Sequence, residues 1–232
     1  MSNIEYSKNT ILKKPHSVIQ FDKTTGELKR PTLLLRKKSG EYIGKLDYTN
    51  LKMSLVGKGL DEISFDVHKY VDGKKCPFWE QLTDLKTVEY VGYGCFELSV
   101  HLNDAEETIK SCVAVSLECE LGQLILREGH YNDDDDDTTP RTVLFDNSKD
   151  GVKRSLLHRV LSDKAPHWGI GFVSPLLNVD GYVYEPNQFQ REYTADGISI
   201  YDFLTGEVAP ESNCIFLFDT YERLIHCVNI ES

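Results

Sequence analysis

Apolar and polar residues alternate strictly in several short runs of the first half of the chain. The run from Ile63 to His68 places its apolar side chains on one face, and the run from Phe96 to Leu102 repeats the pattern. A third run predicts five inward residues: Val113, Val115, Leu117, Cys119 and Leu121. Glycine-containing turns separate these runs from further short apolar ones, which is typical of an antiparallel sheet or barrel. The pattern therefore predicts a mainly β protein with an antiparallel β-barrel domain over residues 31–128.

A helical period replaces the alternation near residue 155. Apolar positions in Ser155–Leu161 recur at helical spacing, and Pro166 marks the expected end of that helix. A second helix is expected at Ile200–Leu204, where Ser199 and Asp202 fit a capping box. Two β-rich runs lie between and after the helices, at Trp168–Val173 and Ile215–Ile225. Residues 151–232 are therefore expected to form a small α+β domain, in which both helices pack on one short sheet.

The remaining segments carry weaker patterns. Residues 1–30 are polar and locally basic, and predict a partly ordered arm or, alternatively, a strand that pairs with a neighbour. Pro77–Leu85 predicts one or two helical turns, whose aromatic residues plug the end of the barrel or, in the alternative, stack on carbohydrate. Residues 129–150 predict an acidic linker that contains Asp133–Asp137. These carboxylates lack the alternating spacing and the glycine of an EF-hand loop, so a solvated linker is favoured over a calcium site.

Charge and cysteine content narrow the class of protein. The net charge of -11 argues against a protein that binds duplex nucleic acid, because counterion release rewards positive surface. The six cysteines show no CxxC pair, so zinc is not expected, and free thiols made in a reducing cytosol are favoured. The sequence shows no signal peptide and no apolar run long enough for a membrane span.

No catalytic motif is present, and we expect neither an enzyme nor a bound cofactor or metal. The sequence has no zinc-protease, nucleophile-elbow, phosphate-loop or dinucleotide pattern, and the seven histidines are scattered singly. His158, His167 and Asp163 form the nearest approach to a hydrolase-like trio. The acidic pairs at residues 106–107 and 118–120 would serve glycoside hydrolysis only if the fold converged them in a cleft. Strand alternation instead predicts that Glu118 and Glu120 share a solvated face.

The order of several short motifs resembles that of a known family. The family is the tail-associated lysin or prophage endopeptidase-tail family of siphophage tail-tip proteins, related in fold to the baseplate hub of contractile phages, and the resemblance is to its N-terminal hub region. The motifs are Gly44–Tyr48, Glu62–Asp66, Pro77–Glu80, Ser116–Leu121, LLHRVL at 156–161, WGIGFV at 168–173, SIYDFL at 199–204 and IFLFDTYERLI at 215–225. They cover roughly residues 30 to 230, and each is weak alone. The acidic run and the chain end at Ser232 depart from the family pattern.

The resemblance implies a fold and a set of partners. The expected fold is a tail-tube-like β-barrel followed by an α+β domain. The expected role is structural: a tail-tip or baseplate hub, made in the host bacterial cytoplasm, that assembles as a trimer and docks on the ring of distal tail protein. It would close or continue the tail channel, with the tape-measure protein as a further neighbour. The alternatives are a peptidoglycan hydrolase or endopeptidase of the tail, and a cell-surface carbohydrate-binding module suggested by Trp79, Trp168 and twelve tyrosines.

If the chain is a hub, its barrel must present a surface to its partners. The outward positions of two alternating strands are small or polar, which suits a wet and moderately weak interface. These interface candidates are Ser64, Asp66, His68, Glu97, Ser99 and His101.

Overall fold

The computed structural model describes residues 20–21, 24, 28–56, 60–102, 108–127, 129–130, 142–177, 182–188, 191 and 193–229. The chain divides into two compact units, residues 1–119 and 120–232. The division falls before residue 128, where the pattern placed the end of the barrel domain, because Leu121 and Leu126 belong to the core of the second unit. Most of the predicted arm lies outside the described residues. Within it, β1 (Gln20–Phe21) pairs antiparallel with β2 (Leu28–Lys29).

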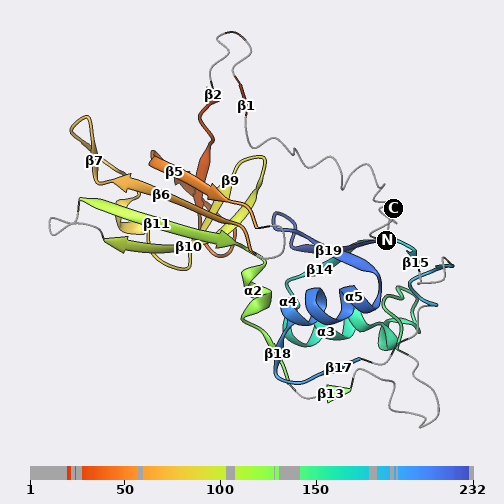
Figure 1. Cartoon of the computed structure of the whole chain (residues 1–232). Coiled ribbons are helices and arrows are strands. Elements are labelled where there is room, and N and C mark those ends of the chain that lie inside the picture. Colours follow the sequence, from red (N-terminus) through yellow and green to blue (C-terminus); the bar gives the residue numbers. More distant parts are fainter. Residues whose placement is uncertain are drawn as a thin grey trace. The chain divides into compact units, whose positions relative to one another are not determined.

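A seven-stranded antiparallel sheet dominates the first unit (Figure 1). Its order is β4-β3-β9-β10-β11-β6-β5, and it curls into a half-barrel, as the alternating runs predicted. The strands are β3 Leu33–Arg36, β4 Tyr42–Lys45, β5 Thr49–Ser54, β6 Glu62–His68, β9 Thr87–Tyr90, β10 Gly94–Leu102 and β11 Ile109–Ser116.

The two edges of this sheet are successive parts of one chain segment. Strand β4 pairs with β3 at one edge, β5 pairs with β6 at the other, and only residues 46–48 separate them. Four Cα–Cα steps span at most about 15 Å, so the edges must approach each other where the chain crosses. We call this crossing, residues 45–49, the seam of the half-barrel.

A short helical turn packs against Lys110 of β11. The 3-10 turn η1 (Trp79–Gln81) buries Trp79, which is 4% exposed. Lys110 reaches inward from β11 and its Nζ donates hydrogen bonds to the carbonyl oxygens of Trp79 at 2.6 Å and Leu82 at 2.7 Å. The same ammonium lies 4.6 Å from the centre of the Trp79 ring, a cation–π contact. Trp79 is therefore buried against Lys110, where the sequence allowed either a plug or an exposed stacking surface.

The inward face of β11 is the opposite of the predicted one. Cys112 and Ala114 are buried, whereas Val113 and Val115 are half-buried on the outer face. The register explains the difference: Cys112 lies between Phe65 and Val100, and Ala114 lies between Ile63 and Leu98. Large inward side chains on both flanking strands leave room only for small ones between them. The strand also ends at Ser116, so residues 117–121 do not continue the predicted alternation.

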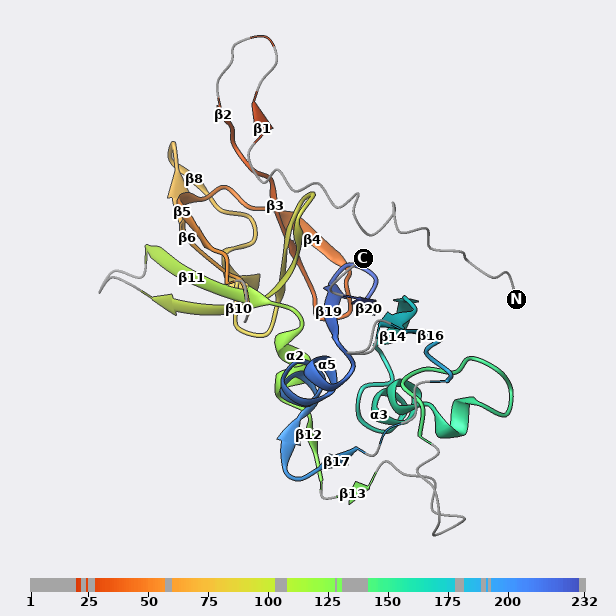
Figure 2. The same ribbon diagram turned by 45° about the vertical axis from the view of Figure 1, so that its right-hand side comes forward.

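The second unit packs its helices on one side of a small mixed sheet (Figures 1 and 2). Strand β20 (Leu224–Asn229) lies between β14 (Gly169–Val173), which is parallel to it, and β19 (Cys214–Asp219), which is antiparallel. One buried cluster joins apolar residues of both helices and of this sheet, as predicted. The remaining short elements are β7 Tyr70–Val71, β8 Lys74–Lys75, α2 Cys119–Gly122, β12 Ile125–Leu126, β13 Gly129–His130, η2 Val152–Arg154, β15 Leu176–Leu177, β16 Val183–Tyr184, β17 Thr194–Ala195 and β18 Ile198–Ser199.

Both predicted helices are present, and the second is longer than expected. Helix α3 (Leu156–Lys164) has Ala165 as its C-cap, directly before Pro166. The second begins at Ser199, whose Oγ accepts a hydrogen bond from the Asp202 backbone N–H at 3.0 Å, which confirms the N-terminal cap. It then runs through α4 (Ile200–Asp202), the π-helical segment η3 (Phe203–Val208) and α5 (Ala209–Glu211).

A histidine joins β14 to β20 where their parallel register is irregular, between Ile170 and Val173. His226 Nδ1 accepts a hydrogen bond of 2.9 Å from the Phe172 backbone N–H. The imidazole occupies the space that a side chain at Gly171 would need, since a Cβ there would overlap the His226 ring. A side chain at this position of the sequence WGIGFV would displace the imidazole from its hydrogen bond with Phe172.

Candidate interaction surface

The six interface candidates share one face of the sheet. They extend from β6 and β10, which flank β11, on the side opposite the buried Phe65, Phe96 and Leu98. Because directly opposed residues of antiparallel strands point the same way, the register aligns them in rows across β11. The rows are Asp66–Ser111–His101 and Ser64–Val113–Ser99, with Glu97 opposite Val115 and His68 opposite Ile109. We call this surface the outer sheet face.

The outer sheet face is unevenly exposed. Ser99 and His101 are exposed near the end of β10, and the other four candidates are half-buried. The two valines of β11 lie in the middle of the surface, half-buried between polar neighbours. Sequence reasoning missed both as surface residues, because their alternation with alanine and serine indicated a buried face. An apolar centre with a polar border is the composition found at protein interfaces.

Asp66 accepts hydrogen bonds from two side chains beside it on this face. Its Oδ1 accepts a hydrogen bond from Ser111 Oγ at 2.6 Å, and its Oδ2 accepts one from Asn50 Nδ2 at 2.7 Å. These two bonds, with Ser111 as the larger cause, hold the pKa of the Asp66 carboxyl below its ordinary value. Next to it, His68 Nε2 lies 3.2 Å from Thr49 Oγ1. The polar residues of β6 are thus tied to β5 and β11.

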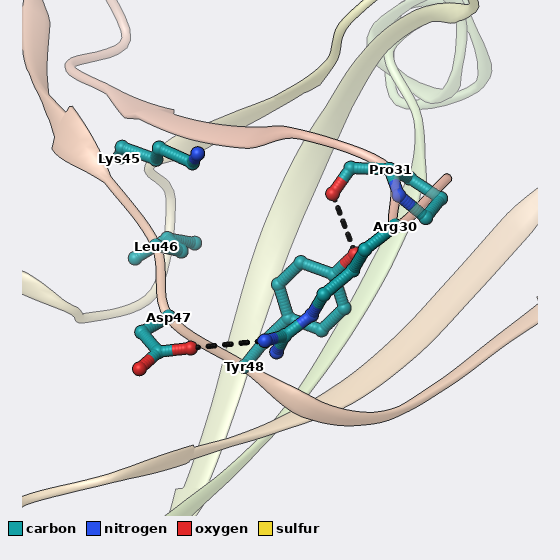
Figure 3. A pocket seen from close by; sticks show the side chains of 6 residues that line it. All are labelled: Arg30, Pro31, Lys45, Leu46, Asp47 and Tyr48. Carbon is teal, nitrogen blue, oxygen red and sulfur yellow. Dashed lines mark hydrogen bonds and ion pairs between the residues drawn. The ribbon is translucent and has the colours of Figure 1, made fainter. Parts of the chain in front are cut away.

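A pocket lies on one side of the seam (Figure 3). Its volume is about 280 Å³, and Arg30, Pro31, Asp47 and Tyr48 line it together with Lys45 and Leu46. The Arg30 guanidinium forms an ion pair of 3.3 Å with Asp47 and lies 4.3 Å above the Tyr48 ring. The Tyr48 hydroxyl donates a 2.6 Å hydrogen bond to the Pro31 carbonyl, and burial raises the pKa of this phenol. These contacts fasten the chain entering β3 to the segment that crosses the seam.

The two histidines of the hydrolase-like trio make separate contacts. His158 Nδ1 lies 2.9 Å from Ser155 Oγ at the start of its own helix, and its ring stacks on Phe145. Burial lowers the pKa of His158. His167 instead pairs with Glu120, at 3.3 Å. The side chain of Asp163 lies outside the described residues.

Glu118 and Glu120 do not share a solvated face, contrary to the prediction. Glu118 is half-buried and accepts a hydrogen bond from Ser116 Oγ. Glu120 lies in α2 and is buried, where it accepts hydrogen bonds from Arg223 Nε at 3.2 Å and Nη2 at 3.4 Å. The strand ends before both residues, so its alternation does not apply to them.

Neither tryptophan offers a surface to a sugar. Trp79 is buried in the barrel, and Trp168 is 3% exposed, edge-on to Phe218 in the core of the second unit. Among the described residues, Trp168 Nε1 is the one buried side-chain nitrogen or oxygen without a hydrogen-bond partner.

The other candidate groups can be placed only in part. The acidic runs at 106–107 and 133–137 lie outside the described residues. In the described part of the chain, no three histidine, cysteine or acidic side chains are grouped to hold a metal ion, and no helix there is long and apolar enough to cross a membrane. All six cysteines are free thiols.

Comparison with known proteins gives a structural likeness but no family. No family model matches the sequence, and no curated protein matches it. Among solved structures, the chain is similar to the crystal structure of the tail protein from Neisseria meningitidis MC58, with a TM-score of 0.51 and 11% sequence identity. The likeness covers 88% of this chain and 52% of that chain, so this chain spans about half the length of that protein. Over most of its length, the chain shares the fold of that tail protein.

Proposed function

We propose that this chain is a structural protein of a phage or prophage tail, positioned in the tail-tip hub. The observation that carries the proposal is the shared fold with a tail protein over 88% of the chain. The order of short motifs from residue 44 to residue 225, which resembles that of tail-tip hubs, supports the same assignment. In this role the chain assembles with its own copies as a trimer, and the distal tail ring and the tape-measure protein are its neighbours.

The outer sheet face is the surface that we assign to the distal tail ring. Its polar rows, and the half-buried Val113 and Val115 between them, suit an interface that is individually weak and becomes firm when several copies engage at once. Asp66 and Glu97 place carboxylates on two strands of this face. A complementary ring surface would then carry basic side chains.

Charge reversal on this face tests the assignment. Asp66→Lys combined with Glu97→Lys should weaken binding to the ring protein about tenfold or more, because two favourable charge contacts become repulsive. Asp66 also supports its neighbours, so Ser99→Arg with His101→Arg provides a second variant at exposed positions, which should weaken binding for the same reason. Glu207→Lys with Glu211→Lys is the matched control, since both residues are exposed on the second unit.

Binding is measured by biolayer interferometry with the purified ring, and folding by circular dichroism. Wild-type affinity in both outer-face variants would place the ring contacts elsewhere. Incorporation of a tagged chain into tail particles, seen by electron microscopy, tests the tail role itself. Particles that never contain the chain would remove the structural assignment.

Two other functions remain as alternatives with direct tests. A peptidoglycan hydrolase or endopeptidase would clear a cell-wall zymogram, and clearing by the purified chain would defeat the structural proposal. A carbohydrate-binding module loses its main support, because both tryptophans are buried. Binding on a glycan array that is lost on Trp79→Ala, with folding retained, would restore it.

A further inference from the structure

A second cavity opens on the seam, beside the pocket of Figure 3, and shares Lys45 and Asp47 with it. Its volume is about 330 Å³. Its walls come from the crossing segment, the end of β6 and the β7–β8 hairpin that follows. The cavity is lined by Lys45, Asp47, His68, Val71, Asp72, Lys74, Lys75, Cys76, Pro77 and Phe78. We call it the seam cavity.

The geometry of the hairpin fixes the lysines at the cavity rim. Strands β7 and β8 are joined by Asp72 and Gly73, both with positive φ, as a tight two-residue hairpin turn requires. This turn aligns Lys74 opposite Val71 and Lys75 opposite Tyr70. On the other wall, the Phe78 ring lies where a side chain at residue 44 would be, so Gly44 lets the ring pack against β4.

The charges of the seam cavity are only partly compensated. Asp47 is paired with Arg30 at 3.3 Å, and Lys75 is paired with Glu80 at 2.9 Å. The side chains of Lys45 and Lys74 have no hydrogen bond or ion pair within the described part of the chain. Asp72, at the tip of the hairpin, is the opposing charge closest to Lys74 in sequence. The lining of the seam cavity therefore combines two lysine side chains that have no partner in the described residues with the apolar Val71, Pro77 and Phe78.

We propose that the seam cavity receives the Asp133–Asp137 segment of a neighbouring copy of this chain. Charge complementarity carries the proposal: five adjacent carboxylates repel one another, and each gains when a lysine ammonium comes within a few ångströms. The contact would join copies within the proposed hub, and so rests on the proposed function. The proposal specifies the two contacting parts: the seam cavity of one copy and the Asp133–Asp137 segment of the next.

An exposed contact of this kind is weak alone and depends on salt. Single exposed ion pairs contribute little, and charges farther apart than about 10 Å are screened at moderate ionic strength. Several such contacts around a closed assembly act together, because each bound copy raises the local concentration of the next. The expected behaviour is association at low salt that is lost as salt is added.

The direct test uses the full chain with Asp133–Asp137 changed to asparagine, so that its own segment does not compete. A fluorescent peptide of residues 131–140 is titrated against it by anisotropy. Saturable binding is expected at low salt. Lys45→Glu with Lys74→Glu should weaken binding about tenfold or more, and a peptide with asparagine in place of the five aspartates should not bind. Lys149→Glu with Lys153→Glu changes the charge equally at exposed positions elsewhere and should alter the affinity less than about twofold.

A charge-swap experiment tests the contact between whole copies. The seam variant with two glutamates and a variant carrying Asp134→Lys and Asp136→Lys should each associate poorly alone and should associate when mixed, as seen by native mass spectrometry. Peptide affinity equal in the seam and control variants, or mixing without recovery, overturns the proposal. Binding of the same variants to the distal tail ring distinguishes this contact from the proposed hub role. If the wild-type chain binds the ring normally but does not bind the peptide, the contact between copies is wrong and the hub role is unaffected.

Discussion

Single residues of this protein show how a buried polar group is satisfied or left without a partner. Lys110 buries its ammonium, but two carbonyl oxygens and an aromatic ring surround it. Desolvation by burial nevertheless lowers the pKa of Lys110, because the charged form loses water. Trp168 represents the opposite case, since its indole N–H is buried and has no acceptor in the described structure.

Trp168→Phe should be well tolerated for this reason. The change removes an N–H that gains nothing in the folded state, so the relief offsets part of the lost packing. We expect a cost below about 1.5 kcal/mol, compared with about 3–5 kcal/mol for Trp168→Ala, which leaves a cavity in the core. Urea unfolding followed by circular dichroism measures both. Equal losses in the two variants would show that the indole N–H has a partner that stabilises the fold.

Asp66 predicts a pH dependence of stability. Its folded pKa is lower than its ordinary value of 3.8, so its ionised form stabilises the fold above that pH. This contribution is lost as the pH falls from 3.8 through the lower folded pKa. Asp66→Asn keeps one acceptor oxygen in place of two, so it should lower the urea midpoint near neutral pH, and the difference should shrink in acid. Asp72→Asn, at an exposed hairpin turn, is the control, and an Asp66 difference that stays constant with pH would contradict the linkage.

At the scale of elements, the two helices depend on the small sheet that they cover. Leu157 and Phe203 are 1% and 0% exposed, in one cluster with Ile225 and Cys227 of β20. Leu157→Asp or Phe203→Asp should each cost on the order of 3–5 kcal/mol, because a carboxylate without a partner replaces a buried apolar group. Ser162→Asp, on the exposed side of α3, is the matched control. Denaturant midpoints unchanged by both core variants would show that the helices do not share this core.

The sequence predicted the buried face correctly for elements that have a single apolar face. It failed where both faces carry apolar residues and the neighbouring strands determine which face is buried. Strand β6 and helix α3 bury the predicted residues, because one face of each is clearly apolar. In β11, both faces carry apolar residues, and the bulk of Phe65 and Leu98 on the flanking strands selects the small ones for the interior. Glu120 was misplaced because its partner, Arg223, lies 103 residues further along the chain.

The outward residues of the candidate surface could also be predicted, because they alternate with one clearly apolar face. Alternation identified the outward residues of β6 and β10, and the structure places all six on one face. The seam cavity left no signal, because it exists only where two sheet edges meet. Its lysines come from residues 45 and 74–75, which no local pattern relates.

At the scale of the whole molecule, the acidic run should be dispensable for folding of the single chain. Replacing Asp133–Asp137 by glycine and serine should leave the unfolding midpoint unchanged or slightly raised, because charge repulsion is removed. Calcium titration of the wild-type chain should give no saturable heat at micromolar concentrations. A stoichiometric calcium isotherm that disappears in the replaced variant would reveal a genuine site, since sensor loops bind at about 10⁻⁷–10⁻⁵ M.

The seam also has a consequence for how the half-barrel folds. Strands β9, β10 and β11 form a meander of local hairpins, while β3–β4 and β5–β6 are two local hairpins joined by three residues. Two pairings distant in sequence remain, β3 with β9 and β6 with β11. Forming either one closes a long loop at an entropic cost. Residues 46–48 join the β3–β4 hairpin to the β5–β6 hairpin. Once one of the two distant pairings has formed, this short connection holds the other hairpin near its partner strand. The second pairing therefore costs little further loop entropy. The two distant pairings should therefore form in a single cooperative step, with the meander as the template and the tethered hairpins closing on both of its edges.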